Sequence, residues 1–388
     1  MLDFTGAPAV DNHCHPMDPR KATLDPGALA RELYHGIGDL PKEGVKPRAW
    51  GASEELQGHF PNMGVVKTMV RQLSRVFDCE PELESVAEER NRRTSEDFGN
   101  YAKLLYDDAK IVATVVDRPG ADDDPGMKLF PGKVMKMFQM DATHKDLLNE
   151  CDSYQDLSQR YGEALDRAVK VDGFIGVKSH LAETFGFGAE PVSDAEAEAA
   201  FSAAKAGDAK ANAALYMATF TATMRQCQGL DIPLHLHSGF TGGIWDGPIS
   251  NADPYLLVPL LRRPEYVRTK VVLLHGAYPW IQRAAALAHG FPHVWVDMGW
   301  TTPWISLRIA ECYRDVIGMA PLSKILVGSG GHNTPEIAWL SALTAKIALG
   351  EVLGDAVRLE LMTFKQAEAA GRMILHDNAA RMYGLLDT

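Results

Sequence analysis

The sequence predicts an α/β fold in which eight parallel strands close into a (β/α)8 TIM barrel. Short apolar segments rich in β-branched residues alternate with long helical segments, and this alternation is typical of a parallel sheet. Eight strand–helix units are the number that closes a barrel. A doubly wound open sheet is the alternative. No Gly-x-Gly-x-x-Gly motif follows the first strand, which disfavours a dinucleotide site in such a sheet.

The predicted strands are short and apolar, and the segments between them are amphipathic or rich in alanine. In chain order the strands are Ala9–Cys14, Ile111–Val116, Val134–Met140, Phe174–Lys178, Ile232–Leu236, Val271–His275, Val294–Asp297 and Ile325–Val327. Among the helices we expect between them are Gln155–Val171, Ala209–Cys227, Ile281–His289 and Ile305–Val316. A turn at Phe185-Gly-Phe-Gly188 precedes an acidic, alanine-rich helix.

The connection after the first predicted strand is too long for an ordinary βα loop. We take the insertion as residues 17–108 and expect helices at Glu54–Gln57, at Val65–Val76 and, reaching its end, at Pro81–Lys110. Active sites of barrels form where strands end and loops begin, so we interpret this insertion as a helical lid over the substrate. The alternative is a separate helical appendage or an oligomer contact. Otherwise we expect residues 1–388 to form a single barrel domain.

The composition predicts a soluble globular protein with a full core. The chain is 46% hydrophobic, without a run of about 18 apolar residues that would span a membrane. Its net charge is −12 and no basic face is evident, which disfavours nucleic acid and anionic membranes as partners. The five cysteines are scattered, and the N-terminus does not resemble a signal peptide. We therefore expect a cytoplasmic protein with reduced thiols. As partners we expect a small-molecule substrate and a second copy of the chain in a homo-oligomer.

Two histidines two residues apart end the first predicted strand, in Asp-Asn-His-Cys-His. Residues i and i+2 of a strand share a face, so His13 and His15 lie side by side at its carboxyl edge. Imidazole is a common ligand of zinc and similar divalent ions. The alternative is a strand end that binds nothing. Cys14 lies between them and faces the opposite side, where we expect it to pack rather than bind a metal.

Further polar residues end other predicted strands. Lys178 ends the fourth strand, His237 follows the fifth, and His275 ends the sixth. His235 shares a face with His237, so either or both could reach a site. Each residue alone is readily explained as a hydrogen-bonded side chain at a strand end. A closed barrel would bring all of them to one rim, and this convergence predicts a metal site.

Taken in order, these motifs resemble the amidohydrolase superfamily, in its amidohydrolase-related branch. They are similar to the subgroup that is also found fused to glutamine-synthetase-like domains. The resemblance implies a barrel that carries one or two divalent metal ions, with zinc expected, and a metal-activated water that attacks an amide or related bond. The matching stretches, which span nearly the whole chain, are Asp11–Pro16, Gly176–Ser179, Pro233–Phe240, Leu274–Pro279, Val296–Asp297, Asn333–Glu336 and His376–Tyr383.

The resemblance implies a role for each strand-end residue. His13 and His15 match the ligand pair of strand one, and His237 matches the histidine of strand five. His275 matches the strand-six histidine, which either binds a second metal or acts in catalysis by orienting the attacking water. Lys178 matches a lysine that is carboxylated and bridges two metals in binuclear relatives. An unmodified ammonium would repel a metal, so the alternative role of Lys178 is to bind a substrate carboxylate.

The chain departs from the family after strand eight, where Gly-Ser-Asp is usual and Gly328-Ser-Gly330 is found. In the family that aspartate is both a metal ligand and the proton shuttle, and Gly330 can do neither. Either the chain is an Asp→Gly form of a hydrolase, which is the reading we favour, or its chemistry has changed. His332, two residues on, could substitute. We expect the chain as written to be a poor hydrolase that Gly330→Asp improves.

The function we expect is hydrolysis of the C–N bond of a small amide, with a γ-glutamyl amide suggested by the resemblance. His180, Trp300 and His332 are candidate substrate-binding residues. Trp300 and Trp304 follow the seventh strand and could form a pocket wall, with ordinary packing as the alternative. Two other functions stay open, namely a metal-dependent decarboxylase or other lyase of the same superfamily, and a catalytically silent barrel.

Overall fold

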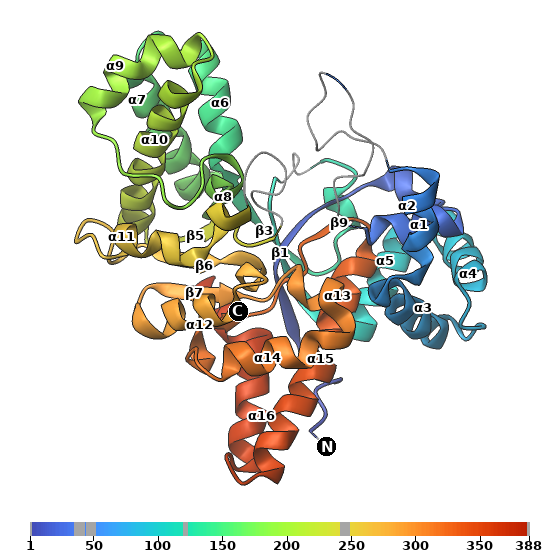
Figure 1. Ribbon diagram of the computed structural model, residues 1–388. Helices are drawn as coiled ribbons and strands as arrows, with labels where there is room; N and C mark the ends of the chain where they lie inside the picture. The colour runs from blue at the N-terminus through green and yellow to red at the C-terminus, as the bar shows by residue number, and fades with distance from the viewer. Residues whose placement is uncertain (1, 35–42, 44–51, 119–122, 241–248, 386–388) are drawn as a thin grey trace. The chain divides into compact units, whose positions relative to one another are not determined.

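The computed structural model describes residues 2–34, 43, 52–118, 123–240 and 249–385 of the chain. The chain divides into two compact units (Figure 1). The first unit comprises Met1–Val134 and Asp297–Thr388, and the second comprises Met135–Val296. Each unit contains strands of a parallel sheet together with helices that pack on them.

The first unit contains β1 (Ala9–Met17), β2 (Ile111–Val116), β8 (Ile325–Leu326) and β9 (Gly331–Asn333). β1 pairs in parallel with β2 on one side and with β9 on the other. The N–H of Asn12 donates to Val327 O at 2.9 Å, and the N–H of Met298 donates to Leu326 O at 2.9 Å. Residues of and beside β8 are thus bonded both to β1 and to the residue that follows the seventh strand, as the closure of a barrel requires.

The second unit contains five parallel strands in sequence order. Its strands are β3 (Lys133–Gln139, which begins at the unit boundary), β4 (Phe174–Ser179), β5 (Pro233–Leu236), β6 (Lys270–Leu273) and β7 (Val294–Asp297). The strands are apolar and mostly buried on both faces, which is typical of parallel sheets covered by helices.

Together the described strands belong to one nine-stranded sheet, which confirms the predicted α/β, barrel-like fold class. The eight predicted strands correspond to β1–β8, and the short strand β9 was not predicted. The prediction that the sixth strand extends to His275 is wrong. β6 ends at Leu273, and Leu274–Ala277 form a 3-10 turn in which His275 has φ 66°. A strand cannot continue through a left-handed residue.

The helices of the second unit agree with the predicted helical segments. The predictions Gln155–Val171, Ala209–Cys227 and Ile281–His289 correspond to α7 (Tyr154–Lys170), α10 (Ala209–Leu230) and α12 (Ile281–Gly290). Helix α9 (Asp194–Lys205) begins with a capping box, in which the side chains of Ser193 and Glu196 bond to each other's backbone N–H groups. The helices are α6 (Met140–Glu150), α7 (Tyr154–Lys170), α8 (Leu181–Thr184), α9 (Asp194–Lys205), α10 (Ala209–Leu230), α11 (Val258–Leu261) and α12 (Ile281–Gly290).

The described part of the insertion after β1 is mainly helical, as predicted, but one predicted helix is two. The helix expected over Pro81–Lys110 is interrupted at Asp97, whose backbone is extended and whose side chain accepts from Asn100 N at 2.9 Å. This cap ends one helix and begins the next. The elements are η1 (Pro19–Ala22), α1 (Pro26–Glu32), α2 (Glu54–His59), η3 (Phe60–Asn62), α3 (Gly64–Phe77), α4 (Leu83–Glu96) and α5 (Phe98–Ala109).

The insertion packs on other parts of the first unit. Its apolar side chains share a core with the start of α15 (Pro335–Arg358), and Trp304 Nε1 donates to Leu33 O at 2.7 Å. Residues 35–42 and 44–51 of the predicted lid lie outside the described residues. The role of residues 17–108 as a lid stays a prediction.

The C-terminal part of the first unit is also helical. The predicted helix Ile305–Val316 is shorter in the structure, because Ser306 has φ 33° and α14 begins only at Ile309. The elements are α13 (Thr301–Ile305), η8 (Ser306–Arg308), α14 (Ile309–Ile317), α15 (Pro335–Arg358), α16 (Phe364–Arg372), the π-helical turn Met373–Asp377 and α17 (Asn378–Met382).

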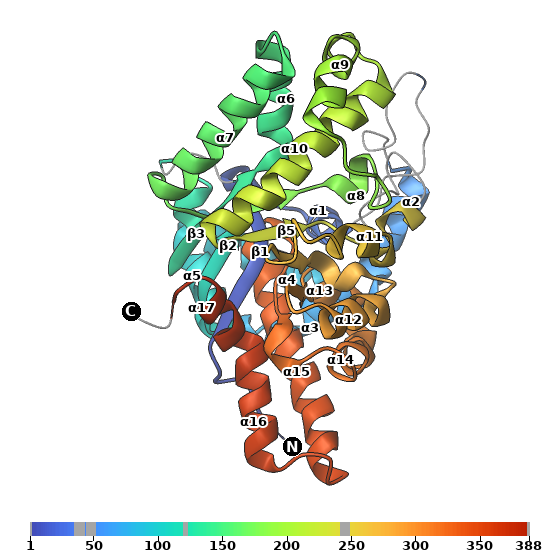
Figure 2. The same ribbon diagram turned by 90° about the vertical axis from the view of Figure 1, so that its left-hand side faces the viewer.

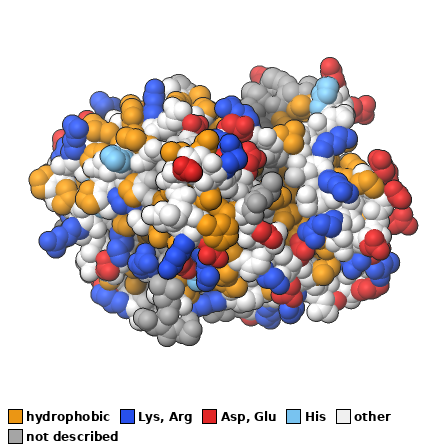
Figure 3. Space-filling model, turned by 90° about the horizontal axis from the view of Figure 1, so that it is seen from below, with side chains coloured by type: hydrophobic (Ala, Val, Ile, Leu, Met, Phe, Trp, Pro, Cys, Tyr) orange, Lys and Arg blue, Asp and Glu red, His pale blue; other side chains and the backbone are white. Residues whose placement is uncertain are grey.

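Helix α15 packs against α16, and the two run side by side (Figure 2). By length and composition α15 could span a membrane, but 83% of its most apolar window is buried within the protein. A core helix of a soluble protein passes the same test. Leu359, Leu361 and Phe364, where α15 connects to α16, are exposed. On the face shown in Figure 3, hydrophobic, acidic and basic side chains are interspersed.

Candidate metal centre

The first candidate metal-binding set lies at the end of β1 and comprises His13, His15 and Asp117. One ligand atom from each residue lies within 4.8 Å of the others. The rings of His13 and His15 meet edge to face with their centroids 5.1 Å apart, and His15 Nδ1 lies 3.8 Å from Asp117 Oδ2. The structure therefore brings the predicted histidine pair together and adds a carboxylate to it.

The local geometry of this set depends on a β-bulge in β1. Asp11 aligns with Thr114 on β2, and Cys14 aligns with Val116, so β1 has one extra residue between these pairs. Such a bulge redirects the side chains beside it, and bulges are frequent next to active sites. Cys14 is buried in the hydrophobic core, as expected. Asp117 follows β2 directly, and its N–H donates to Cys14 O at 2.8 Å.

Burial favours a cation at this set. Asp117 and His13 are almost fully buried, with exposed fractions of 0% and 1%. A buried carboxylate is stable only when hydrogen bonds or a positive charge compensate for the lost water. Two imidazoles and one carboxylate are also a ligand set that zinc accepts. The residues present thus fit a divalent cation.

A second buried carboxylate braces β1 against the segment after β8. Asp11 accepts from Ser329 N at 2.8 Å and from Ser329 Oγ at 2.7 Å. Burial raises the pKa of Asp11 to about 7, although the hydrogen bonds from Ser329 act in the opposite direction. The N–H of Gly330 donates to His13 O at 2.7 Å. The backbone that carries His13 is therefore held from both sides.

Gly330, where the family has aspartate, is in a conformation that favours glycine. Its φ is 62°, and a Cβ built there would lie 3.1–3.3 Å from the Cβ, N and Cα atoms of Trp300. The Trp300 ring is buried and stacks on Trp304, with centroids 5.7 Å apart. The ring of His332 stacks on the ring of His15, with centroids 4.0 Å apart. Substrate binding by Trp300 and His332 stays a prediction.

Asp297, in the Val296–Asp297 stretch of the resemblance, is part of a separate hydrogen-bond network. It accepts from Asn12 Nδ2 at 3.0 Å and from Gly299 N at 2.8 Å. Tyr383 in turn donates to Asn12 Oδ1 at 2.5 Å. The side chain of Asp297 is fully buried, so these bonds compensate for its lost hydration.

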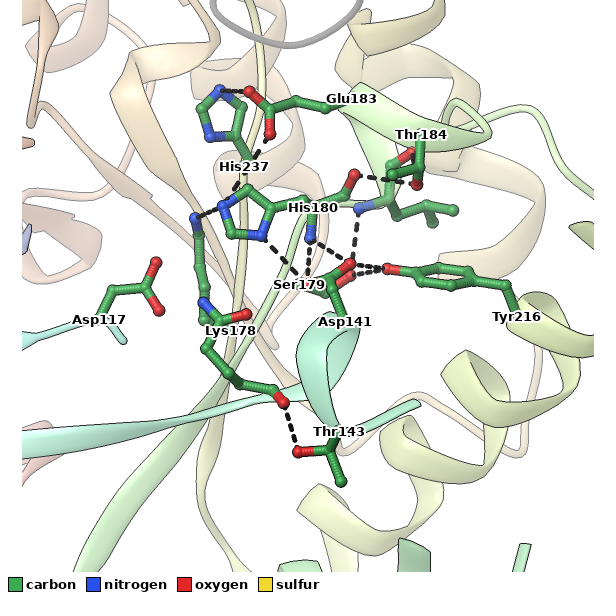
Figure 4. A network of polar contacts seen from close by, with 12 residues as sticks. Asp117, Asp141, Thr143, Lys178, Ser179, His180, Glu183, Thr184, Tyr216 and His237 are labelled. Carbon is green, nitrogen blue, oxygen red and sulfur yellow. Dashed lines mark hydrogen bonds and ion pairs between the residues drawn. The ribbon is translucent and has the colours of Figure 1, made fainter. Parts of the chain in front are cut away.

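The second candidate set lies in the second unit and comprises His180, Glu183 and His237. Figure 4 shows the Glu183 carboxylate beside both imidazole rings. Glu183 Oε2 lies 3.9 Å from His180 Nε2, and Glu183 Oε1 lies 3.6 Å from His237 Nε2. His180 follows β4 directly, His237 follows β5, and Glu183 lies in the short helix α8.

A buried network orients His180. Asp141 Oδ2 lies 3.1 Å from His180 Nδ1 and accepts from His180 N at 3.1 Å, while Tyr216 donates to Asp141 Oδ1 and contacts Ser179 Oγ (Figure 4). Burial tends to raise the pKa of Asp141, but its hydrogen bond and charge interaction with His180 lower it overall. Asp141 therefore accepts a hydrogen bond from the Nδ1–H group of His180, which leaves Nε2 as the atom that could bind a metal.

The other residues predicted in this region lie close to the second set. Lys178 is buried, and its Nζ lies 2.9 Å from His180 Nε2. His275, on the turn after β6, meets His237 edge to face with ring centroids 4.5 Å apart. His235 is fully buried on β5. The predicted joint site of His13, His15 and His237 combines residues of different units and stays a prediction, as do the ligand roles of Lys178 and His275.

Three carboxylates of these sets were missed by the sequence analysis, namely Asp117, Glu183 and Asp141. Asp117 directly follows a predicted strand, so the criterion that selected His237 would have selected it. Asp141 follows the third predicted strand in the same way. Glu183 lies three residues after His180, a spacing that places two side chains on one side of a helical turn.

Comparison with known proteins identifies the family. The family model described as amidohydrolase matches residues 159–385. The chain therefore belongs to the amidohydrolase family, which confirms the resemblance found in the sequence.

Individual relatives are more distant. Protein fluG of Emericella nidulans is 27% identical over 246 residues, which cover 60% of this chain and 28% of fluG. A presumed metal-dependent hydrolase from Lactobacillus casei has a TM-score of 0.81 and 21% identity, and the match covers 99% of this chain and 98% of that one. A uronate isomerase from Bacillus halodurans has a TM-score of 0.63 and 14% identity, covering 98% and 94%. At these identities the two structures show a shared fold alone.

Proposed function

We propose that the chain is a metal-dependent hydrolase that cleaves the C–N bond of a small amide. The observation that carries the proposal is the set His13, His15 and Asp117, three ligand groups within 4.8 Å of one another in one unit. Three protein ligands with one open position are typical of catalytic zinc sites. Membership of the amidohydrolase family supports the same reaction class.

In this proposal His13, His15 and Asp117 hold the divalent cation, with zinc as the expected ion. When bound, such a cation lowers the pKa of water towards neutrality and polarises a substrate carbonyl. The contact between Asp11 and Ser329 keeps the backbone of His13 in place. His275 would orient the attacking water or donate to the developing oxyanion.

The proposed substrate is an amide that also carries a carboxylate, such as a γ-glutamyl amide. The buried ammonium of Lys178 would bind that carboxylate, with His180 as a further candidate contact, because a buried carboxylate needs a positive group to compensate for its lost hydration. Trp300 and His332 are the further candidate substrate contacts. We also propose a cytoplasmic homo-oligomer, and the net charge of −12 disfavours nucleic acid and anionic membranes as its partners.

We further propose that Gly330 impairs the hydrolase. A general acid or base contributes about 10²–10⁴-fold to a rate, and glycine cannot supply one. His332 is the nearest titratable side chain on the same segment and would be the first substitute.

The test is product analysis on a panel of γ-glutamyl amides with the chelator-stripped chain, before and after Zn²⁺ is restored. Release of amine or ammonia only with the metal supports the proposal. Release of carbon dioxide from carboxylic acids, without amide cleavage, would replace it with the decarboxylase alternative. A chain that holds metal but converts neither class of compound would be the silent barrel.

A further inference from the structure

We infer that His180, Glu183 and His237 bind a divalent cation of their own. This set differs from the ligands that the family resemblance implies, because it includes Glu183 and His180 and leaves out Lys178. All three side chains belong to the second unit, and each is largely buried.

The spacing of the three groups fits a shared cation better than it fits hydrogen bonds. Hydrogen bonds between nitrogen and oxygen are about 2.7–3.2 Å long, and the two carboxylate–imidazole distances are 3.9 and 3.6 Å. Ligands about 2.1 Å from a tetrahedral zinc ion lie about 3.4 Å from each other. The distance from each carboxylate oxygen of Glu183 to its nearest imidazole nitrogen is therefore close to the distance between two ligands of one ion.

The surroundings of His180 provide an independent second observation. Its Nδ1 lies 3.1 Å from Asp141 Oδ2, and Asp141 is itself held by Tyr216. Metal-binding histidines commonly use their other ring nitrogen in this way, which fixes the tautomer and the direction of the ligand lone pair. Asp141 therefore aims the Nε2 atom of His180 at the side where Glu183 lies.

Lys178 is the rival to a metal at this set, because its ammonium lies beside His180. Nζ is 2.9 Å from His180 Nε2, within hydrogen-bond distance of the same lone pair that a metal would use. The ammonium and the metal thus compete for His180. This differs from the bridging role implied by the family, in which a carboxylated Lys178 would itself be a ligand.

The test measures zinc in the full chain after stripping and reloading, together with the visible absorption of the Co²⁺-substituted protein. We expect two ions per chain in the wild type and one in Glu183→Gln. The matched control is Glu190→Gln, the same change at a side chain that is 77% exposed and pairs only loosely with Arg263. It should keep both ions. Glu183→Gln with an unchanged number of ions would overturn the inference.

Two further variants protect the test against misfolding and against the rival ligand. Asp141→Asn keeps all three ligands but removes the charge behind His180, and it should weaken this ion by about 10–100-fold. Lys178→Met should bind the ion at least as tightly as the wild type, because the competing ammonium is gone. Loss of the ion in Lys178→Met, with Glu183→Gln unaffected, would show that a carboxylated lysine is the ligand instead.

The inference can fail separately from the proposed function. Asp117→Asn removes a ligand of the first set and should leave the ion at Glu183 in place. If Glu183→Gln loses its ion while Asp117→Asn keeps a full complement and full activity, the proposed function fails and the second site stands. If the reverse is found, the proposed function stands and the second site does not exist.

Discussion

The two candidate sets differ in how they are built, although both combine imidazoles with one carboxylate. His13 and His15 come from the bulged strand β1, and Asp117 directly follows the neighbouring strand β2. His180 and His237 come from two adjacent strands, and the carboxylate of Glu183 comes from a short helix. The first set is thus determined by strand pairing, and the second by the turn that follows a strand.

The braces behind the two sets also differ. Asp11, which accepts two bonds from Ser329, supports the backbone of the first set. Asp141 bonds directly to a ligand side chain of the second set and therefore sets its tautomer. In addition, an ammonium lies beside the second set, at Lys178. The first set is thus braced through its backbone, whereas in the second set one ligand side chain is held by a carboxylate and contacted by an ammonium.

The largest expected effect is the loss of activity in Asp117→Asn. An amide in place of the carboxylate removes one of three ligands and should lower kcat/KM by about 10²–10⁴-fold, since metal activation contributes several kcal/mol to the barrier. The measurement is steady-state amide hydrolysis with Zn²⁺ in excess. Asp107→Asn, an exposed aspartate of the same unit that pairs with Lys103, is the control and should behave as the wild type. Equal activity in both variants would remove Asp117 from the metal site.

The next effect concerns the insertion, which we expect to support the first set and not the second. Arg90 is fully buried, pairs with Glu336 at the start of α15 and donates to Lys21 O at 2.9 Å. Arg90→Met leaves Glu336 as a buried charge without its partner and should lower the free energy of unfolding by about 3–5 kcal/mol.

The control for this prediction is Arg92→Met on the same helix. Arg92 is half exposed and pairs with Glu89 and Glu96, so its loss should cost at most about 1 kcal/mol. Urea unfolding and zinc titration of both variants give the two readouts. The comparison between the sets would be broken if Arg90→Met weakened the ion at Glu183 as much as the ion at Asp117.

At Gly330 we expect two effects of opposite sign, a loss of stability and a gain in turnover. Any side chain there must adopt φ 62° and displace Trp300 slightly, so Gly330→Asp and Gly330→Asn should both lose about 1–2 kcal/mol of stability. Only the aspartate can restore a proton shuttle, and it should raise turnover by about 10²-fold or more. Thermal unfolding and amide hydrolysis are measured for both variants. Equal turnover in Asp and Asn variants would place the shuttle elsewhere, with His332 as the first candidate.

Local patterns predicted most of the fold and two of the three residues of the first set. The strands β2 and β7 have the predicted bounds, because each is a short run of mainly apolar residues with an aspartate at its end or directly after it. The pairing of His13 and His15 follows from the two-residue period of a strand. The break at Asp97 was missed because a helical pattern continues on both sides of the cap.

The carboxylates were harder to predict because their partners come from distant parts of the chain. Asp117 meets His15, and Asp141 meets His180, only through the register of neighbouring strands and the loops that follow them. The positive φ of His275 and Gly330 likewise depends on packing that no local pattern reports. Residue type and position relative to a strand end are visible in the sequence, but the distance between two strand ends is not.

The smallest expected effect is a pH dependence of stability that belongs to the second unit alone. His144 on α6 is buried, its Nδ1 lies 3.0 Å from Thr219 Oγ1, and its ring meets Tyr216. Burial lowers its pKa to about 4, and the charge of Asp141 only partly opposes this.

Because the unfolded chain takes up this proton near pH 6.5 and the folded chain near pH 4, stability is lost as the pH falls below about 6.5. The wild type should lose about 2 kcal/mol more than His144→Gln between pH 7 and pH 5, since the variant has no titrating ring at this position. Urea midpoints at the two pH values measure the difference, with exposed His289→Gln as a control that should follow the wild type. If His144→Gln instead loses as much stability as the wild type, then His144 is not buried in its neutral form. In that case the packing around Tyr216 and Asp141 does not hold His180 as firmly as their hydrogen bonds indicate. Asp141→Asn should then have little effect on the ion proposed at His180, Glu183 and His237.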